Sequence, residues 1–258
     1  MHFTFLGTSA AIPSLQRDTT WLAFSSEGEL LLVDCGGSPL QKLQRAKCHI
    51  AHLSRIVVTH VHPDHAYGLP ALIQNLMIQK RRAPLMISCR VEHLERLQSL
   101  LDLFGLLDRE KEFPILFETV EPREGIEVAR TPTFILSASP NAHGAMPNLA
   151  VRIDLRSNGR AVVYSSDTEP CEAVIRLSRG ADTLIHEATF SSLDPDRSGA
   201  HSTARQAGEV AQASGVKQLI LTHIDPRYHN DPSPLIREAR EAFSGELLVA
   251  EEFRQYQI

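Results

Sequence analysis

Short runs of apolar, often β-branched residues recur along the chain and alternate with longer amphipathic stretches. The runs have the length and composition of buried strands and predict them near 2–7, 19–24, 30–34, 55–59, 84–88, 131–138, 149–155, 160–165, 182–186, 217–222 and 246–250. The amphipathic stretches predict helices near 37–47, 66–80, 91–104, 169–178, 203–214 and 232–243. The chain has two β-rich halves, and in each half strands are followed by helices, which indicates an α/β protein. The pattern alone leaves open how the sheets and helices are arranged.

The helix expected at 203–214 has the clearest ends. Ser202 or Thr203 can cap its start, Gln206 is placed for a capping box with Thr203, and Gly215 can terminate it. His201 is therefore expected at the entrance of a well-defined helix, where free backbone N–H groups suit a phosphate oxygen.

Composition narrows the class of protein. No linker or low-complexity segment divides the 258 residues, so we expect a single domain over residues 1–258. Neither a leader pattern nor an apolar run of about twenty residues is evident, which predicts a soluble protein. The four cysteines are widely spaced and favour a reducing, cytoplasmic location; they are Cys35, Cys48, Cys89 and Cys171.

The strongest chemical signal is the segment Thr59-His60-Val61-His62-Pro63-Asp64-His65, which directly follows an apolar run. In an extended segment His60 and His62 point the same way, while Asp64 and His65 fall on the turn into the next helix. Imidazole and carboxylate together suit zinc, with manganese or iron as alternatives. One short segment can thus offer ligands to two adjacent ions.

Three further candidate ligands lie at the ends of predicted strands or in the loops that follow. His143, Asp167 and His223 occupy these positions. Loops beyond strand ends are where a rigid sheet usually displays functional groups. Each residue alone could have an ordinary structural role, but together with the first cluster they complete a set for two metal ions.

Seven ordered motifs resemble the metallo-β-lactamase-fold hydrolases, and most closely their ribonuclease Z branch. The resemblance runs nearly end to end and includes the metal motif described above. The other motifs are Phe5-Leu6-Gly7-Thr8-Ser9-Ala10-Ala11-Ile12-Pro13 with Arg17-Asp18-Thr19-Thr20, Val33-Asp34-Cys35-Gly36, Gly68-Leu69-Pro70, His186-Glu187-Ala188-Thr189-Phe190, His201-Ser202-Thr203-Ala204, and Leu221-Thr222-His223-Ile224 with Arg227-Tyr228.

The resemblance implies a four-layer αββα sandwich with the metal site at one edge. It also implies two zinc ions that activate a water molecule. By position, one ion would be held by His60, His62 and His143, the other by Asp64, His65 and His223, with Asp167 bridging them.

The candidate catalytic residues are Asp64, His201 and Glu187. Asp64 is a candidate acceptor for the proton of the attacking water, and His201 resembles the family's imidazole that contacts the scissile phosphate or protonates the leaving oxygen. Asp34 and Glu187 suit carboxylates that orient metal-bound imidazoles.

The substrate is less well defined by the sequence. Members of the branch commonly carry a long arm between the His143 and Asp167 positions that grips transfer RNA, whereas only 24 positions separate these residues here, enough for a short loop and a hairpin. A formal charge of −5 provides no global attraction for RNA. Local basic groups would have to bind it, and the candidates are Lys42, Arg45, Lys47, Lys80, Arg81 and Arg82.

We therefore expect a two-metal phosphodiesterase, with transfer RNA 3′-end processing as the activity that the resemblance names and small diesters such as cyclic nucleotides as an alternative. A hydrolase of a sulfate ester, lactone or thioester is the second hypothesis, because fold does not fix substrate. A noncatalytic metal-binding module is the third. Members of the branch are often homodimers, and we expect the same here.

Overall fold

The computed structural model describes residues 1–26, 28–107, 113–195 and 199–258, and two β-sheets dominate it. Seven strands of the described chain form the first sheet: β1 (His2–Gly7), β2 (Trp21–Ser26), β3 (Glu29–Val33), β4 (Leu53–Val58), β5 (Leu85–Arg90), β6 (Ile115–Val120) and β14 (Gln255–Gln257). Seven more form the second: β7 (Ile126–Arg130), β8 (Phe134–Pro140), β9 (Leu149–Leu155), β10 (Ala161–Tyr164), β11 (Thr183–Glu187), β12 (Gln218–Thr222) and β13 (Glu246–Val249).

The two sheets have related topologies. The strand order is β14-β1-β2-β3-β4-β5-β6 in the first sheet and β13-β12-β11-β10-β9-β8-β7 in the second. Strands β3 to β6 are parallel to one another, as are β10 to β13, while the hairpins β1–β2 and β8–β9 are antiparallel. The carboxyl ends of the parallel strands consequently lie at the same end of each sheet. An α/β protein usually binds its ligands at this end.

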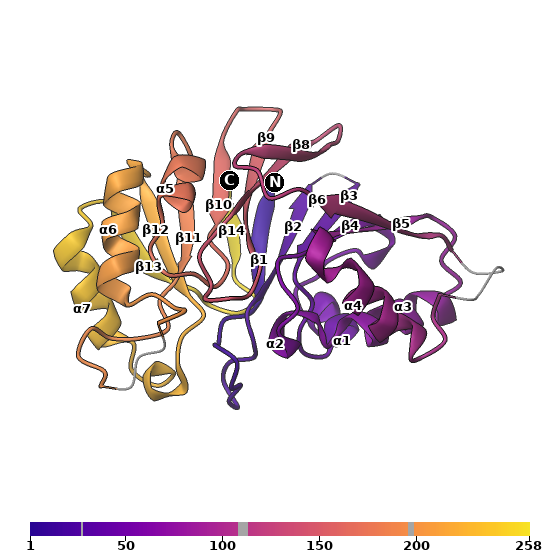
Figure 1. Cartoon of the computed structure of the whole chain (residues 1–258), viewed down its shortest axis with the longest axis horizontal. Coiled ribbons are helices and arrows are strands. Elements are labelled where there is room, and N and C mark those ends of the chain that lie inside the picture. The colour runs from indigo at the N-terminus through magenta and orange to yellow at the C-terminus, as the bar shows by residue number, and fades with distance from the viewer. Residues whose placement is uncertain (27, 108–112, 196–198) are drawn as a thin grey trace.

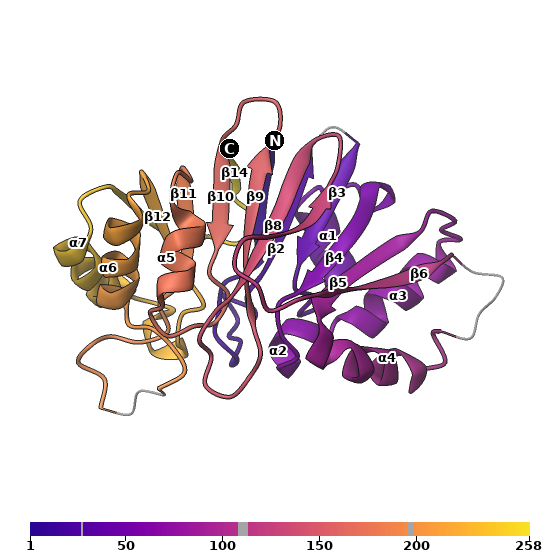
Figure 2. The same ribbon diagram turned by 45° about the horizontal axis from the view of Figure 1, so that its top comes forward.

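Helices cover the outer face of each sheet (Figures 1 and 2). The first sheet packs on α1 (Pro39–Arg45), α3 (Leu69–Ile78) and α4 (Leu94–Asp102), and the second on α5 (Glu172–Ser178), α6 (Ala204–Ser214) and α7 (Ser233–Ala242). A third apolar core lies between the sheets and includes Phe5, Phe24, Leu136, Ile153 and Tyr164. The expected four-layer αββα sandwich is confirmed.

Most predicted elements are present within a few residues of their expected ends, and three strands were missed. These strands, β6, β7 and β14, lie at sheet edges, where one side is unpaired and the apolar pattern is weak. The helix expected at 66–80 is instead two helices, α2 (Pro63–Ala66) and α3. Gly68 lies between them, and glycine is needed there because a Cβ atom would lie 2.8 Å from the carbonyl oxygen of Cys35.

The helices of the described chain are short. None of them combines the length and the apolar character that crossing a lipid bilayer requires.

Candidate metal centre

Histidine and carboxylate side chains gather where the carboxyl ends of the strands of both sheets meet. Three groups have ligand atoms within 4.8 Å of one another; two of them contain Asp167, and the third is Glu187, His201 and His223. The first group is His60, His62, His143 and Asp167, and the second is Asp64, His65, Asp167 and His223. All seven predicted metal ligands are therefore in one cluster, grouped as the resemblance implied.

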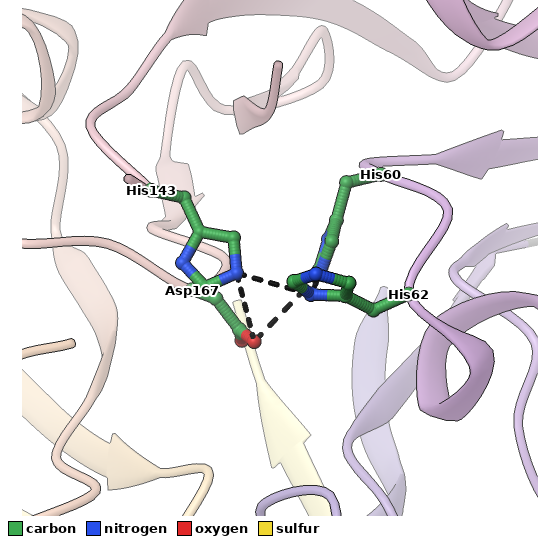
Figure 3. Close-up of side chains that lie close together, drawn as sticks. All are labelled: His60, His62, His143 and Asp167. Carbon is green, nitrogen blue, oxygen red and sulfur yellow. Dashed lines mark hydrogen bonds and ion pairs between the residues drawn. The ribbon is translucent and has the colours of Figure 1, made fainter. Parts of the chain in front are cut away.

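The first group joins the two sheets (Figure 3). His60 and His62 follow β4 of the first sheet, and His143 lies in the loop after β8 of the second. The Nδ1 atom of His62 lies 2.9 Å from Nε2 of His60 and 3.1 Å from Nε2 of His143. The Oδ2 atom of Asp167 lies 3.8 Å and 4.0 Å from the same two Nε2 atoms. These nitrogens converge on one point beside the carboxylate.

The second group is built around the same oxygen of the Asp167 carboxylate. Its Oδ2 atom lies 3.3 Å from Nε2 of His65 and 3.2 Å from Nε2 of His223. The carboxylate of Asp64, on α2, lies 3.3 Å and 3.8 Å from the same two imidazole nitrogens. One carboxylate oxygen thus faces both groups, as a bridging ligand should.

Backbone geometry at three strand ends turns the chain toward this cluster. Asp34 after β3, Ser166 after β10 and His223 after β12 have φ angles of 65°, 53° and 54°. This left-handed region is uncommon for residues other than glycine. Such conformations concentrate at functional sites.

Hydrogen bonds to the Nδ1 atoms orient two of the candidate histidine ligands. The Nδ1 atom of His65 lies 2.8 Å from Oδ2 of Asp34, which also accepts a hydrogen bond from the hydroxyl of Thr59. Nδ1 of His223 lies 2.9 Å from the hydroxyl of Thr189. These contacts leave the Nε2 atoms of both imidazoles facing the centre, and the predicted orienting role of Asp34 agrees with its position.

A buried polar network that the sequence analysis missed links the two halves behind the cluster. Ser166 donates its hydroxyl hydrogen bond to Oγ1 of Thr59, 2.9 Å away in the other half. The amide of Asn148 donates to the backbone oxygen of Asp167 at 2.7 Å, and its Oδ1 lies 3.2 Å from the Ser166 hydroxyl. Small polar residues at strand ends have many ordinary roles, so the sequence carries no signal for this network.

Electrostatics and unpaired atoms indicate that this centre suits a divalent cation. The buried atoms Nε2 of His65, Nε2 of His223 and Oδ1 of Asp167 make no hydrogen bond. Burial alone would raise the pKa of Asp167, but His223 and His65 hold it well below its usual range. Burial alone would lower the pKa of His223, but Asp167 raises it to about 10. The carboxylates thus favour positive charge here, and the donor set is one that zinc accepts.

His201 and Glu187 lie beside the metal cluster. The Nδ1 atom of His201 is 2.8 Å from Oε1 of the fully buried Glu187, while 18% of the His201 side chain is exposed. Burial lowers the pKa of His201, but the Glu187 carboxylate outweighs it and raises that pKa. The His201 ring stacks at 5.3 Å on His223, with an interplanar angle of 17°. The Glu187 carboxylate therefore favours the protonated form of an imidazole that lies next to the predicted metal ligands.

Lys42, Arg45 and Arg81, which are predicted RNA-binding cations, make contacts within the protein. Lys42 pairs with Asp18 at 3.1 Å, and Arg81 donates to three backbone oxygens at the start of β4 and just before β5. The guanidinium of Arg45 lies 4.0 Å over the Phe253 ring, although this residue is exposed. The other three predicted cations are also exposed; they are Lys47, Lys80 and Arg82.

The connection between His143 and Asp167 is short and fully described. It contains β9, a tight turn and β10, and residues 143–167 hold no further helix or strand. The long arm expected of the ribonuclease Z branch is therefore absent from this position.

Comparison with known proteins gives consistent matches. A family profile described as "Beta-lactamase superfamily domain" matches residues 30–224. Ribonuclease Z of Methanosarcina acetivorans is 32% identical over 300 aligned positions, which include 100% of this chain and 98% of that protein. The alignment has 42 more positions than the 258 residues of this chain, so the relative has segments that this chain lacks.

Two solved structures are similar over nearly their whole length. The short form of human tRNase Z, ELAC1, has a TM-score of 0.82 and 25% identity and covers 100% of this chain and 99% of its own. The metallo-β-lactamase fold protein YhfI from Bacillus subtilis has a TM-score of 0.81 and 24% identity, covering 99% and 98%.

Proposed function

The chain belongs to the β-lactamase superfamily and, within it, to the ribonuclease Z family, and from this we propose that it is a two-zinc phosphodiesterase that hydrolyses RNA. The observation that carries the proposal is the convergence of seven histidine and aspartate side chains from both sheets around the Oδ2 atom of Asp167. The three buried ligand atoms without a hydrogen bond support it further. We propose that residues 1–258 act as one hydrolase domain.

In this proposal each metal has a defined set of protein ligands. His60, His62 and His143 would hold one ion, the remaining three ligands would hold the other, and Asp167 would bridge them; the second set is Asp64, His65 and His223. When bound, the ions would neutralise phosphate charge and lower the pKa of a water molecule to about neutrality. Manganese and iron(II) are alternatives for the same donors.

The protein's own groups supply proton transfer. Asp64 is the least buried of the three aspartates at the centre, with 11% of its side chain exposed, and can accept the proton of the attacking water. Glu187 fixes Nδ1 of His201, so Nε2 of His201 is the atom that can donate a proton to the leaving oxygen. The raised pKa of His201 favours the protonated form that this step needs.

RNA is the proposed substrate, and transfer RNA precursors are the candidate within that class. The support comes from family membership and from the names of the relatives. The absent arm and the formal charge of −5 favour a second candidate, a small phosphodiester such as a cyclic nucleotide. Each of these features lowers the affinity for a long polyanion such as RNA.

Cleavage of a transfer RNA precursor with a 3′ trailer tests the proposal. The zinc-loaded protein would be assayed on this RNA and, in parallel, on bis(4-nitrophenyl) phosphate and a cyclic nucleotide. We expect a cut at the trailer junction. Hydrolysis of the small diesters alone would support the second candidate, and hydrolysis of none of them would contradict phosphodiesterase function.

Two histidine variants provide the control. His62→Ala removes a proposed ligand and should abolish hydrolysis, whereas His52→Ala makes the same change at an exposed residue outside the cluster and should not. Full turnover by His62→Ala would contradict the metal mechanism. The homodimer and the cytoplasmic location stay predictions, and light scattering of the purified protein checks the first.

A further inference from the structure

A cavity of about 320 Å³ lies beside His201 and has no role in the mechanism above. Ligand sites in proteins usually measure roughly 300–1,000 Å³, so this one has room for a single nucleoside rather than for an oligonucleotide. Its lining combines apolar and polar side chains. The lining residues are Glu169, Pro170, Phe190, Gly199, His201, Thr203 and Gln206.

The side chain of His201 lies between the cavity and the candidate metal centre. Its ring contacts His143 at 4.9 Å and His223 at 5.3 Å, both proposed metal ligands, and it also lines the cavity. In the proposed function His201 gives a proton to the leaving oxygen. The group bonded to that oxygen can then extend past His201 into this cavity, which borders the same side chain.

The polar lining suits a base better than a phosphate. No lysine or arginine is among the described lining residues, and the carboxylate of Glu169 would repel an anion. Phe190 and Pro170 supply apolar surface, although Phe190 is only 8% exposed. A base can pack on such groups while polar side chains meet its edge.

Glu169 and Gln206 offer complementary hydrogen-bonding atoms. The backbone N–H of Glu169 donates to the oxygen of Ala142 at 2.7 Å, which fixes its backbone, and its carboxylate is an acceptor. Oε1 of Gln206 accepts from the backbone N–H of Thr203 at 2.9 Å in the capping box of α6. The amide nitrogen of Gln206 is thus the donor that a ligand can use.

We propose that this cavity is a subsite for the nucleobase on the leaving side of the cleaved bond, with guanine as the preferred base. This inference rests on the proposed function. Guanine presents two adjacent N–H donors, which match the two oxygens of a carboxylate, beside an O6 acceptor for the amide of Gln206. Uracil offers a single N–H flanked by two carbonyl oxygens and fits the same atoms less well.

Hydrolysis of dinucleoside monophosphates tests the subsite. GpU, UpG and UpU would be compared with the zinc-loaded enzyme, and the product that carries the new hydroxyl identifies the leaving nucleoside. We expect kcat/KM to be about tenfold higher with guanosine than with uridine on that side, a ratio typical of one charge-assisted hydrogen bond. Equal values for the two bases would overturn the proposal.

Variants connect the preference to the named residues. Glu169→Gln should reduce the guanine preference about tenfold, while Glu209→Gln, the same change at an exposed position of α6, should keep it. Gln206→Glu keeps an acceptor for the capping box but loses the amide donor, so it should weaken the preference without unfolding the helix. An unchanged preference in both Glu169→Gln and Gln206→Glu would refute the assignment.

Two further measurements separate failure of the subsite from failure of the proposed function. Bis(4-nitrophenyl) phosphate has no nucleobase, so its hydrolysis reports on the metal centre alone. Calorimetric titration with guanosine and uridine monophosphates needs no turnover. Tighter binding of guanosine monophosphate that is lost in Glu169→Gln would support the subsite even without catalysis, whereas hydrolysis of all diesters with no base discrimination would refute only the subsite.

Discussion

Three residues at the metal centre hold a backbone conformation that costs roughly 1–3 kcal/mol each. Asp34, Ser166 and His223 have positive φ angles, and each is tied down by buried hydrogen bonds that offset this cost. Asp34 accepts from the backbone and the hydroxyl of Thr59, and the backbone oxygen of His223 accepts from Thr189. The fold therefore holds the candidate ligands in place, so that metal binding would require little further ordering of these side chains.

Glu187→Gln should shift the pH dependence of kcat. The Glu187 carboxylate raises the pKa of His201, so its removal lowers that pKa. A proton donor loses activity as pH rises through its pKa, hence the basic limb of the profile should move to lower pH. We expect kcat at pH 8 to fall roughly 10²-fold, because general acid catalysis contributes about that much. An unmoved basic limb, measured with UpU, whose leaving ribose oxygen needs a proton, would contradict the donor role.

The sequence predicted which ligands would come together but not what holds them. Histidines in a dense motif, combined with acidic residues and histidines at strand ends, are typical of a metal site, so the clustering of the seven candidate ligands could be predicted. Thr59, Ser166, Asn148 and Thr189 could not, because hydroxyl and amide groups satisfy ordinary turns throughout proteins. The contact between Thr59 and Ser166, for example, joins residues that are 107 positions apart in the sequence.

At the scale of elements, helix α6 begins just after His201 and packs closely on α7. Its capping box forms as predicted, between Thr203 and Gln206, and Gly215 ends the helix with a left-handed conformation. Gly208 lies at the contact with α7, where a Cβ atom would be 2.7 Å from the backbone oxygen of Ala239. A glycine in mid-helix is unfavourable by propensity, so this close approach accounts for its presence.

Gly208→Ala should lower the free energy of unfolding by about 1–2 kcal/mol. Alanine gains about 1 kcal/mol of helix propensity, but overpacking against backbone typically costs 1–3 kcal/mol and should outweigh it. Urea unfolding at fixed zinc concentration measures the change. Glu209→Ala, at the exposed neighbouring position, should change stability by less than about 0.5 kcal/mol, and a stabilised Gly208→Ala would show that the two helices separate readily.

Buried strands were predictable because both of their faces are apolar, as in β10 with Ala161-Val162-Val163-Tyr164. The missed strands β6 and β7 have several half-exposed or exposed residues, and β14 has only three residues. Such strands are defined by the neighbour they pair with. A single sequence contains that information only indirectly.

At the scale of the whole molecule, the metal centre joins the two sheets. His60 and His62 follow β4 of the first sheet, whereas His143, Asp167 and His223 come from the second. Any ion held by residues from both sides links the halves in the folded state only. Such an ion must stabilise the fold by mass action. The sandwich itself was expected from the resemblance, since periodicity alone allowed other α/β arrangements.

Zinc should therefore raise the melting temperature. A free concentration about 100 times the dissociation constant adds about 2.7 kcal/mol, which corresponds to roughly 5–10 °C for a chain of this size. Calorimetry of the chelator-treated protein with and without zinc measures the shift. His52→Ala should shift like the parent protein and His62→Ala by much less; an equal shift in both variants would place the stabilising ion elsewhere.

The pairing of β14 with β1 has a consequence for synthesis on the ribosome. Strand β1 is made first, yet one of its edges stays open until residues 255–257 arrive, because β14 is its partner on that side. His223 likewise emerges late, so the second ligand set is incomplete during most of translation. At about 5–20 residues per second, the nascent chain spends many seconds with an unpaired strand edge and without the complete set of candidate ligands, and during that interval the edge is open to pairing with other chains.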